Sequence, residues 1–176
     1  ILTWDQLYNI SSIPEHMIVV GSGVTGAEFA SAFTSLGSKV SLVSSRDRVL
    51  PGEDADAAQV LEDVFLRRGM NLLNRSRAQS VTRQGDGVVV TLTDGRRIEG
   101  SHCLMAVGSV PNTQKMGLLE AGVALNEMGY IIADRVSRTS VRGVYAAGDV
   151  TGVLMLASVA AAQGRIAMMH HLGEAV

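Results

Sequence analysis

The chain has 176 residues, of which 47% are hydrophobic and 18% are charged, and its formal net charge is −2. This composition can build a packed core in one large or two small domains and excludes a disordered chain, and the lack of a basic block argues against nucleic acid or an anionic membrane as the main partner. No apolar run reaches the length of a membrane span, and no signal-peptide pattern is present. The single cysteine, Cys103, excludes an internal disulfide. We therefore expect a cytoplasmic location without an integral membrane segment.

The first part of the chain predicts a strand, a turn and a helix. Residues 1–14 are expected to form an irregular lead-in that Trp4 and Tyr8 pack onto the domain. Residues 17–20 are consecutive apolar residues, which is typical of a parallel strand buried on both faces. Residues 24–36 then have the pattern of a helix, and Gly37 follows as a terminator.

The turn between this strand and this helix carries glycines at the spacing G-x-G-x-x-G. Gly21 permits the tight turn, Gly23 allows the backbone to approach a pyrophosphate, and Gly26 allows the helix to pack closely on the strand. The helix that follows points its free N–H groups and the positive end of its dipole at an anion. Because the glycines lie between a strand and a helix, the pattern favours a dinucleotide site over a simple glycine-rich turn.

The end of the second expected strand, residues 39–43, bears on which nucleotide binds. An NAD site usually has an acidic residue there to hold the ribose diol, whereas an NADP site lacks the acid and adds an arginine for the 2′-phosphate. Here Ser44 stands at the acid position and is followed by Ser45 and Arg46. Hydroxyls beside a guanidinium favour NADP, but Asp47 can partly neutralise Arg46 and leaves NAD as the alternative.

A second helix and a third parallel strand are expected next. Residues 53–68 form an amphipathic pattern, with acids near the first turn and arginines near the last, as the helix dipole favours. Gly69 ends this helix, and residues 70–73 predict a short strand. The predicted buried face of the helix consists of Val60, Leu61, Val64 and Phe65.

The periodicity then changes to short β segments at residues 80–83, 88–92 and 97–99. Gly-containing turns separate them, which predicts an antiparallel meander. Residues 102–107 return to the parallel sheet, where we expect Cys103 to be a core residue rather than a nucleophile. The sequence therefore predicts an α/β fold in which helices cover one face of a parallel sheet and a three-stranded meander covers the other.

Patterns in the remainder of the chain are weaker. Residues 108–113 are interpreted as a turn that leaves the first domain. Residues 143–147 predict a strand and residues 154–171 a long helix, whose His170 and His171 fit a surface role better than metal ligation. The side chains expected along the turns of this helix are Leu156, Val159, Ala160, Gln163, Ala167 and Met168, and the methionines expected in the core are Met155, Met168 and Met169.

Four of these stretches, in this order, resemble the pyridine-nucleotide disulfide oxidoreductase family. Residues 19–30 resemble its second nucleotide-binding turn, and residues 107–113 its Gly-Arg-x-Pro-Asn-Thr segment. Residues 144–150 resemble its second flavin motif, and residues 156–160 its Leu-Ala-His-x-Ala stretch. The resemblance covers nearly the whole chain and is greatest to the actinobacterial branch that is related to lipoamide dehydrogenase and acts as NAD(P)H:quinone reductase.

The resemblance implies a Rossmann-like FAD/NAD(P)-binding fold and a role for each matching residue. The glycine turn would hold the pyrophosphate of NADP or NAD, Glu28 would lie near the nicotinamide, and Gly108 would line the same side. Residues 44–46 would meet the adenosine ribose and any 2′-phosphate. The implied contacts of the nicotinamide nucleotide are Gly21, Gly23, Val24, Thr25, Gly26, Glu28, Ser44, Ser45, Arg46 and Gly108.

The resemblance also implies contacts with FAD. Asp149, after Gly148, would accept a hydrogen bond from a ribityl hydroxyl. The backbone of Leu156 and Ala157 would pass the flavin ring. None of the implied site residues is a catalytic acid, base or nucleophile, or a metal ligand.

The chain departs from the family pattern in several respects. Ser109 replaces the family's arginine and Ser158 its histidine. The flavin-binding βαβ unit with its cysteine pair, and the dimerisation domain with its catalytic histidine, have no counterpart in this sequence. We therefore interpret residues 1–109 as an NAD(P)-binding domain and residues 110–176 as part of an FAD domain, in a fragment of a homodimeric protein that is inactive by itself.

The function that the resemblance implies is transfer of hydride from NAD(P)H to FAD and onward to an acceptor, most simply a quinone or another small molecule. Within the family, a dihydrolipoamide dehydrogenase or a soluble transhydrogenase is the alternative. A non-catalytic nucleotide-binding or redox-sensing module is the alternative of another class, since it needs the same glycines but no flavin motif.

Overall fold

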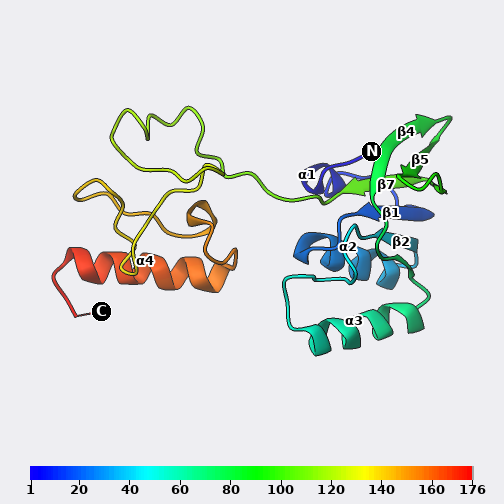
Figure 1. The fold of residues 1–176 in the computed structure, drawn as a ribbon, viewed down its shortest axis with the longest axis horizontal. Helices are drawn as coiled ribbons and strands as arrows, with labels where there is room; N and C mark the ends of the chain where they lie inside the picture. Colours follow the sequence, from blue (N-terminus) through cyan, green and yellow to red (C-terminus); the bar gives the residue numbers. More distant parts are fainter. Residues whose placement is uncertain (176) are drawn as a thin grey trace. The chain divides into compact units, whose positions relative to one another are not determined.

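A four-stranded parallel sheet forms the centre of the first part of the chain in the computed structural model, which describes residues 1–175 (Figure 1). The strand order is β3-β2-β1-β7, and β1 pairs with both β2 and β7 in parallel register. A helix connects each of the first two pairs, as a parallel crossover requires. The elements are β1 His16–Val20, α2 Val24–Ser35, β2 Lys39–Val43, α3 Ala55–Arg67, β3 Asn71–Leu73 and β7 His102–Met105.

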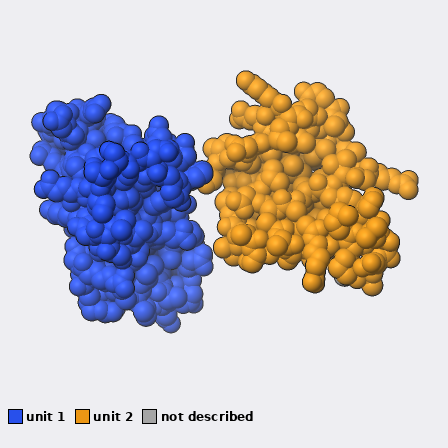
Figure 2. All heavy atoms as spheres, turned by 180° about the vertical axis from the view of Figure 1, so that it is seen from behind, with its two compact units in different colours: residues 1–108 blue, residues 109–176 orange. Residues whose placement is uncertain are grey.

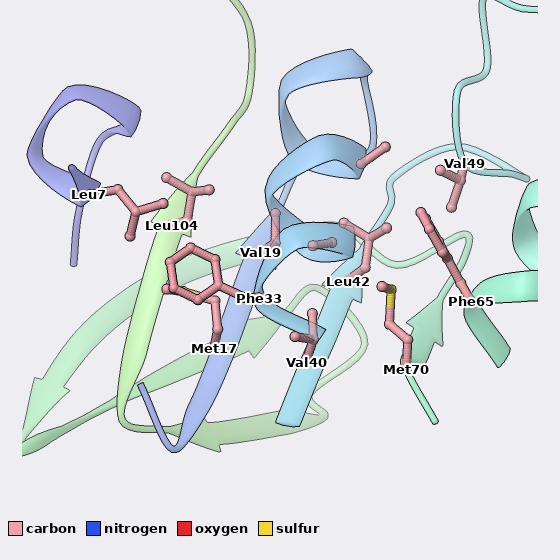
Figure 3. Packing of buried hydrophobic residues seen from close by; sticks show 12 residues of the cluster. Leu7, Met17, Val19, Phe33, Val40, Leu42, Val49, Phe65, Met70 and Leu104 are labelled. Carbon is pink, nitrogen blue, oxygen red and sulfur yellow. The ribbon is translucent and has the colours of Figure 1, made fainter. Parts of the chain in front are cut away.

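The two faces of the sheet are covered differently, as predicted. Met17 and Val19 of β1 join one buried cluster with Phe33 of α2, which Figure 3 shows lying against the sheet. The intervening Ile18 and Val20 belong to a second cluster beneath the antiparallel meander, because successive side chains of a strand point to opposite faces. The meander has the order β4-β5-β6, with β4 Ala78–Gln84, β5 Gly87–Leu92 and β6 Arg97–Gly100.

The buried face of α3 differs from the predicted one. Phe65 is buried, but Val60 is 63% exposed and Glu62 is buried instead. The Glu62 Oε1 atom accepts hydrogen bonds from the Val49 N–H at 2.7 Å and from Asn74 Nδ2 at 2.8 Å. These bonds offset the cost of burying a carboxylate, and the apolar pattern alone did not reveal them.

The lead-in is more ordered than predicted. It contains a short helix, α1 Trp4–Leu7, and Leu2 forms a parallel bridge with Leu104 at the end of the sheet. Its buried anchor is Leu7, whereas Trp4 is 55% exposed. Trp4 packs edge-on against Tyr8, and Tyr8 against Phe29 of α2, so the prediction that Trp4 anchors this segment was wrong.

The chain divides into two compact units, one of residues Ile1–Gly108 and one that begins at Ser109 (Figure 2). The second unit has a small core of Val123, Ile131 and Ala146. Residues 143–147, predicted as a strand, contribute only one antiparallel bridge, between Tyr145 and Arg138. A strand needs a continuous hydrogen-bonding neighbour, and the described residues supply only this single pairing. The regular elements of this unit are the 3₁₀ turn η1 Asp149–Thr151 and the helix α4 Ala157–His171.

Helix α4 begins later than predicted, and most of its side chains are not buried. Ala167 is its one buried residue. Met155, ahead of the helix, and Met168 are exposed, so their predicted place in the core is wrong for the unit as described. His170 lies beside Tyr145, with 2.8 Å between His170 Nδ1 and the Tyr145 hydroxyl.

Candidate functional site

Gly21 closes the turn at the carboxyl end of β1 and cannot be replaced without displacing backbone. Its φ is +112°, a region that other residues rarely adopt. Its N–H donates to the Val43 carbonyl at 2.9 Å, which ties the turn to the neighbouring strand β2. A Cβ atom at this position would lie 2.1 Å from the carbonyl oxygen of Ala106. The fold of the first unit therefore requires glycine here, with or without a ligand.

Gly26 and Gly23 differ sharply in their surroundings. A Cβ at Gly26 would lie 1.9 Å from the Gly21 carbonyl oxygen, so Gly26 is needed for α2 to pack on the turn. A Cβ at Gly23 would have no neighbour within 4 Å, and the φ of Gly23 is −70°. The protein thus has no internal reason for glycine at residue 23, and the open space beside it is what a phosphate group would need.

The first turn of α2 has donors for such a group. Gly23 is the N-cap, it provides no side-chain cap, and the first bond of the helix runs from the Ala27 N–H to the Gly23 carbonyl at 2.9 Å. The N–H groups of Val24, Thr25 and Gly26 therefore have no partner within the helix. They combine with the helix dipole to favour an anion at this end. Glu28, one turn further along, is exposed.

Gly108 follows β7 at the same carboxyl edge of the sheet as the glycine turn. The Ala106 N–H donates to the Val20 carbonyl at 2.8 Å, which holds the two strand ends together. Gly108 itself is exposed with a φ of +134°, and a Cβ there would meet no atom within 4 Å. The structure thus brings Gly108 and the glycine turn to one edge.

Of the three polar residues predicted to bind the adenosine part of the nucleotide, all in the loop after β2, one is buried and two are exposed. Ser44 is fully buried, and its hydroxyl lies 2.7 Å from that of Ser22, inside the glycine motif. It also accepts from the Arg46 N–H at 3.2 Å, so Ser44 fixes the loop to the glycine turn. Ser45 and Arg46 are exposed. Only these two of the three present side chains to a ligand in this conformation.

Arg48, the other arginine of this loop, is turned inward. It is half-buried, and its Nη2 atom lies 3.4 Å from the Glu53 carbonyl oxygen that it donates to. This contact distinguishes Arg48 from Arg46, because it ties the Arg48 side chain to the backbone of its own loop.

In the second unit, Gly148 forms a turn that is fixed against α4. Its φ is +84°, and a Cβ there would lie 3.2 Å from the Ala160 Cβ. The Gly148 N–H donates to Gln163 Oε1 at 2.7 Å, and the Thr151 hydroxyl donates to the Gly148 carbonyl at 2.8 Å. Asp149 follows with its side chain exposed. The N-cap of α4 is Leu156, and both Leu156 and Ala157 are exposed.

No sequence pattern indicated two residues that hold the candidate site together. The Ser22 hydroxyl bonds the glycine turn to Ser44, and the Gln163 side chain accepts a hydrogen bond from the Gly148 turn. Ser22 occupies a variable position of the motif, and Gln163 was assigned only to the turns of its helix. No periodicity signals which atom a buried polar side chain will meet.

Residues 1–175 offer neither a reactive thiol nor a cluster of metal ligands. Burial raises the pKa of the Cys103 thiol to about 11, so it stays protonated near neutral pH and is no nucleophile. Over these residues, no three His, Cys, Asp or Glu side chains gather where a metal ion could bind. None of their helices has the length and apolar character needed to cross a bilayer.

Comparison with known proteins gives consistent matches over the chain. A model of the pyridine nucleotide-disulphide oxidoreductase family matches residues 1–164. A protein of Mycobacterium tuberculosis named NAD(P)H dehydrogenase (quinone) is 62% identical over 176 residues, which are the whole of this chain and 36% of that protein. A dihydrolipoyl dehydrogenase of Chlamydia muridarum is 36% identical over 99% of this chain and 37% of its own length.

Solved structures agree with this. The crystal structure of LpdA from Mycobacterium tuberculosis matches 99% of this chain and 38% of that one, with a TM-score of 0.93 and 62% identity. The HOCl-induced flavoprotein disulfide reductase RclA from Escherichia coli matches 99% of this chain and 40% of its own, with a TM-score of 0.91 and 29% identity. The chain therefore spans a little over a third of the length of the relatives it matches.

Proposed function

Because the chain belongs to the pyridine nucleotide-disulphide oxidoreductase family, we propose that its first unit binds NAD(P)H for a flavin-dependent oxidoreductase. The second unit forms part of the FAD site of that enzyme. The whole enzyme is a cytoplasmic homodimer, and the 176-residue chain by itself has no turnover.

The observation that carries this proposal is the contrast among the three glycines. Gly21 and Gly26 are required by backbone packing, but Gly23 borders open space at the N-terminus of a 12-residue helix. A purely structural turn would not need glycine at residue 23. A pyrophosphate that approaches the backbone does need it, because a Cβ would stand where the anion binds.

Most of the predicted site residues have a proposed part in binding NAD(P)H or FAD. The N–H groups of the α2 first turn hold the pyrophosphate, while Ser45 and Arg46 contact the adenosine ribose and its 2′-phosphate. Gly108 and Glu28 line the nicotinamide side. Gly148 presents Asp149 to a ribityl hydroxyl of FAD, and the backbone of Leu156 and Ala157 lies along the flavin ring. When bound, the flavin supplies the hydride-accepting chemistry, and the protein contributes orientation and electrostatics.

The proposed acceptor is a quinone, which is supported by 62% identity to a relative named NAD(P)H dehydrogenase (quinone). The second candidate activity is that of a dihydrolipoamide dehydrogenase, which is supported by relatives named dihydrolipoyl dehydrogenase at 36% identity. Assays of the intact protein with a quinone and with dihydrolipoamide distinguish the two activities. An intact protein that binds NAD(P)H but shows no flavin absorbance would instead favour a nucleotide-sensing module.

The preference for NADP rests on Arg46 and is tested by substitution. We expect Arg46→Ala to weaken NADPH binding by about 1.5–3 kcal/mol, because a charge-assisted hydrogen bond to the 2′-phosphate is lost. NADH has no such phosphate, so its binding should not change. Titration of both nucleotides by calorimetry measures this. Equal losses for NADPH and NADH would exclude a role of Arg46 in reading the 2′-phosphate.

A further inference from the structure

The loops after β2 and β3 are joined by backbone hydrogen bonds. The Ser76 N–H donates to the Ser44 carbonyl, and the Arg75 N–H donates to the Arg46 carbonyl, both at 2.7 Å. These bonds extend the pairing of β2 and β3 beyond the end of the sheet. They hold Arg75 next to Arg46, although the two are 29 positions apart in the sequence.

Arg75 is held in an unusual conformation. Its φ is +51°, in the left-handed region, where glycine or asparagine is the usual residue and a long side chain is strained. The following residue is fixed, since the buried Ser76 hydroxyl donates to the Asn74 carbonyl at 3.0 Å and accepts from Arg96 at 2.7 Å. Folding alone gives no reason for arginine at residue 75, which suggests a role for its side chain.

The charges of Arg46 and Arg75 are available to a ligand. Both residues are exposed, and neither forms an ion pair within residues 1–175. By contrast, Arg96 is paired with Asp94 at 2.7 Å, and Arg48 donates to a backbone carbonyl. Two unpaired guanidinium groups on adjoining loops supply the charge that a dianion requires, because each can donate two parallel hydrogen bonds to phosphate oxygens.

We propose that Arg75 is a second specificity residue, which acts with Arg46 to bind the 2′-phosphate of the adenosine ribose. This inference rests on the proposed function of the glycine turn as a nicotinamide nucleotide site. It adds a residue from the loop after β3, whereas the preference for NAD or NADP is usually predicted from the residues at the end of β2 alone. NADPH is therefore held by both loops, whose backbone bonds keep the main chain of Arg75 beside that of Arg46.

The test is Arg75→Gln in the intact protein, with Arg83→Gln on the exposed face of β4 as the matched control. We expect Arg75→Gln to raise the Kd of NADPH, and of the probe 2′-AMP, about tenfold or more. The Kd of NADH should stay within about twofold, and the salt dependence of NADPH binding should decrease. Arg75→Lys should retain part of the affinity, and Arg83→Gln should change neither Kd. If Arg75→Gln does not fold, Arg75→Asn replaces it, since asparagine tolerates this φ.

Each outcome decides the question. Unchanged NADPH binding in Arg75→Gln, or equal weakening of NADPH and NADH, overturns the role of Arg75. If Arg46→Ala still weakens NADPH selectively in that case, the proposed function stands and only the second residue is wrong. An unsubstituted protein that binds neither nucleotide overturns both.

Discussion

Gly26→Ala should lower the free energy of unfolding of the first unit by about 2–3 kcal/mol, which is unusual for a substitution to alanine inside a helix. Helix propensity alone would favour alanine by about 1 kcal/mol. The added Cβ, however, would lie 1.9 Å from the Gly21 carbonyl oxygen, and no rotamer change can relieve a contact between two backbone-fixed atoms. Helix α2 would have to move off β1 and would loosen the packing of Phe33 and Ala30 in the core.

Urea titration of the 176-residue chain, followed by circular dichroism and by the fluorescence of Trp4, measures this effect. Gly164→Ala in α4 is the matched control, because a Cβ there meets no atom within 4 Å. It should be neutral or stabilise the chain by up to about 1 kcal/mol. A loss of less than about 0.5 kcal/mol for Gly26→Ala would show that the helix does not lie on the turn as closely as described.

The first unit was predictable because its information is local. A run of apolar residues such as residues 17–20 predicts a strand covered on both faces, and Gly37 and Gly69 mark the ends of the helices before them. The bounds of β2 agree with the predicted strand. The meander followed from its turns, since Gly85-Asp86-Gly87 and Asp94-Gly95 leave few other pairings. In α3 the prediction failed at Val60 and Glu62, because a buried carboxylate is stabilised by partners distant in sequence.

The second unit was predicted less well because its patterns depend on distant partners. Residues 143–147 have strand composition but find one bridging partner, and α4 is rich in apolar and small residues, of which Ala167 alone is buried. The local pattern of apolar residues indicates that a segment is suited to burial, but it does not indicate which segment packs against it.

The candidate site shows the same limit at the scale of single atoms. The motif spacing assigned Gly21 to the turn, Gly26 to helix packing and Gly23 to a ligand, and the structure has close backbone contacts at Gly21 and Gly26 and none at Gly23. The sequence failed at the next loop, where it placed Ser44 with Ser45 and Arg46, yet Ser44 is buried and bonded to Ser22. Whether a hydroxyl faces inward depends on the neighbouring strand and turn, which the local sequence does not specify.

Gly23→Ala should therefore separate binding from folding. The φ of −70° and the open space at residue 23 accept alanine, so the free energy of unfolding should change by no more than about 1 kcal/mol, the cost of a poorer N-cap. Binding of NAD(P)H should weaken by about 3 kcal/mol or more, or roughly 100-fold, because the methyl group would keep the pyrophosphate away from more than one N–H donor of α2.

The two glycine variants have to be compared at a temperature where both are folded. If Gly23→Ala keeps its stability and loses NADPH and NADH equally, the pyrophosphate lies at the α2 N-terminus, since that group is common to both nucleotides. Unchanged binding in Gly23→Ala would place the nucleotide elsewhere and would leave the glycine spacing as a packing device for α2 alone. Loss of NADPH binding without loss of NADH binding would assign residue 23 to the adenosine 2′-phosphate. We do not expect this result, because the hydrogen-bonded loops that carry Arg46 and Arg75 are the proposed site of that phosphate.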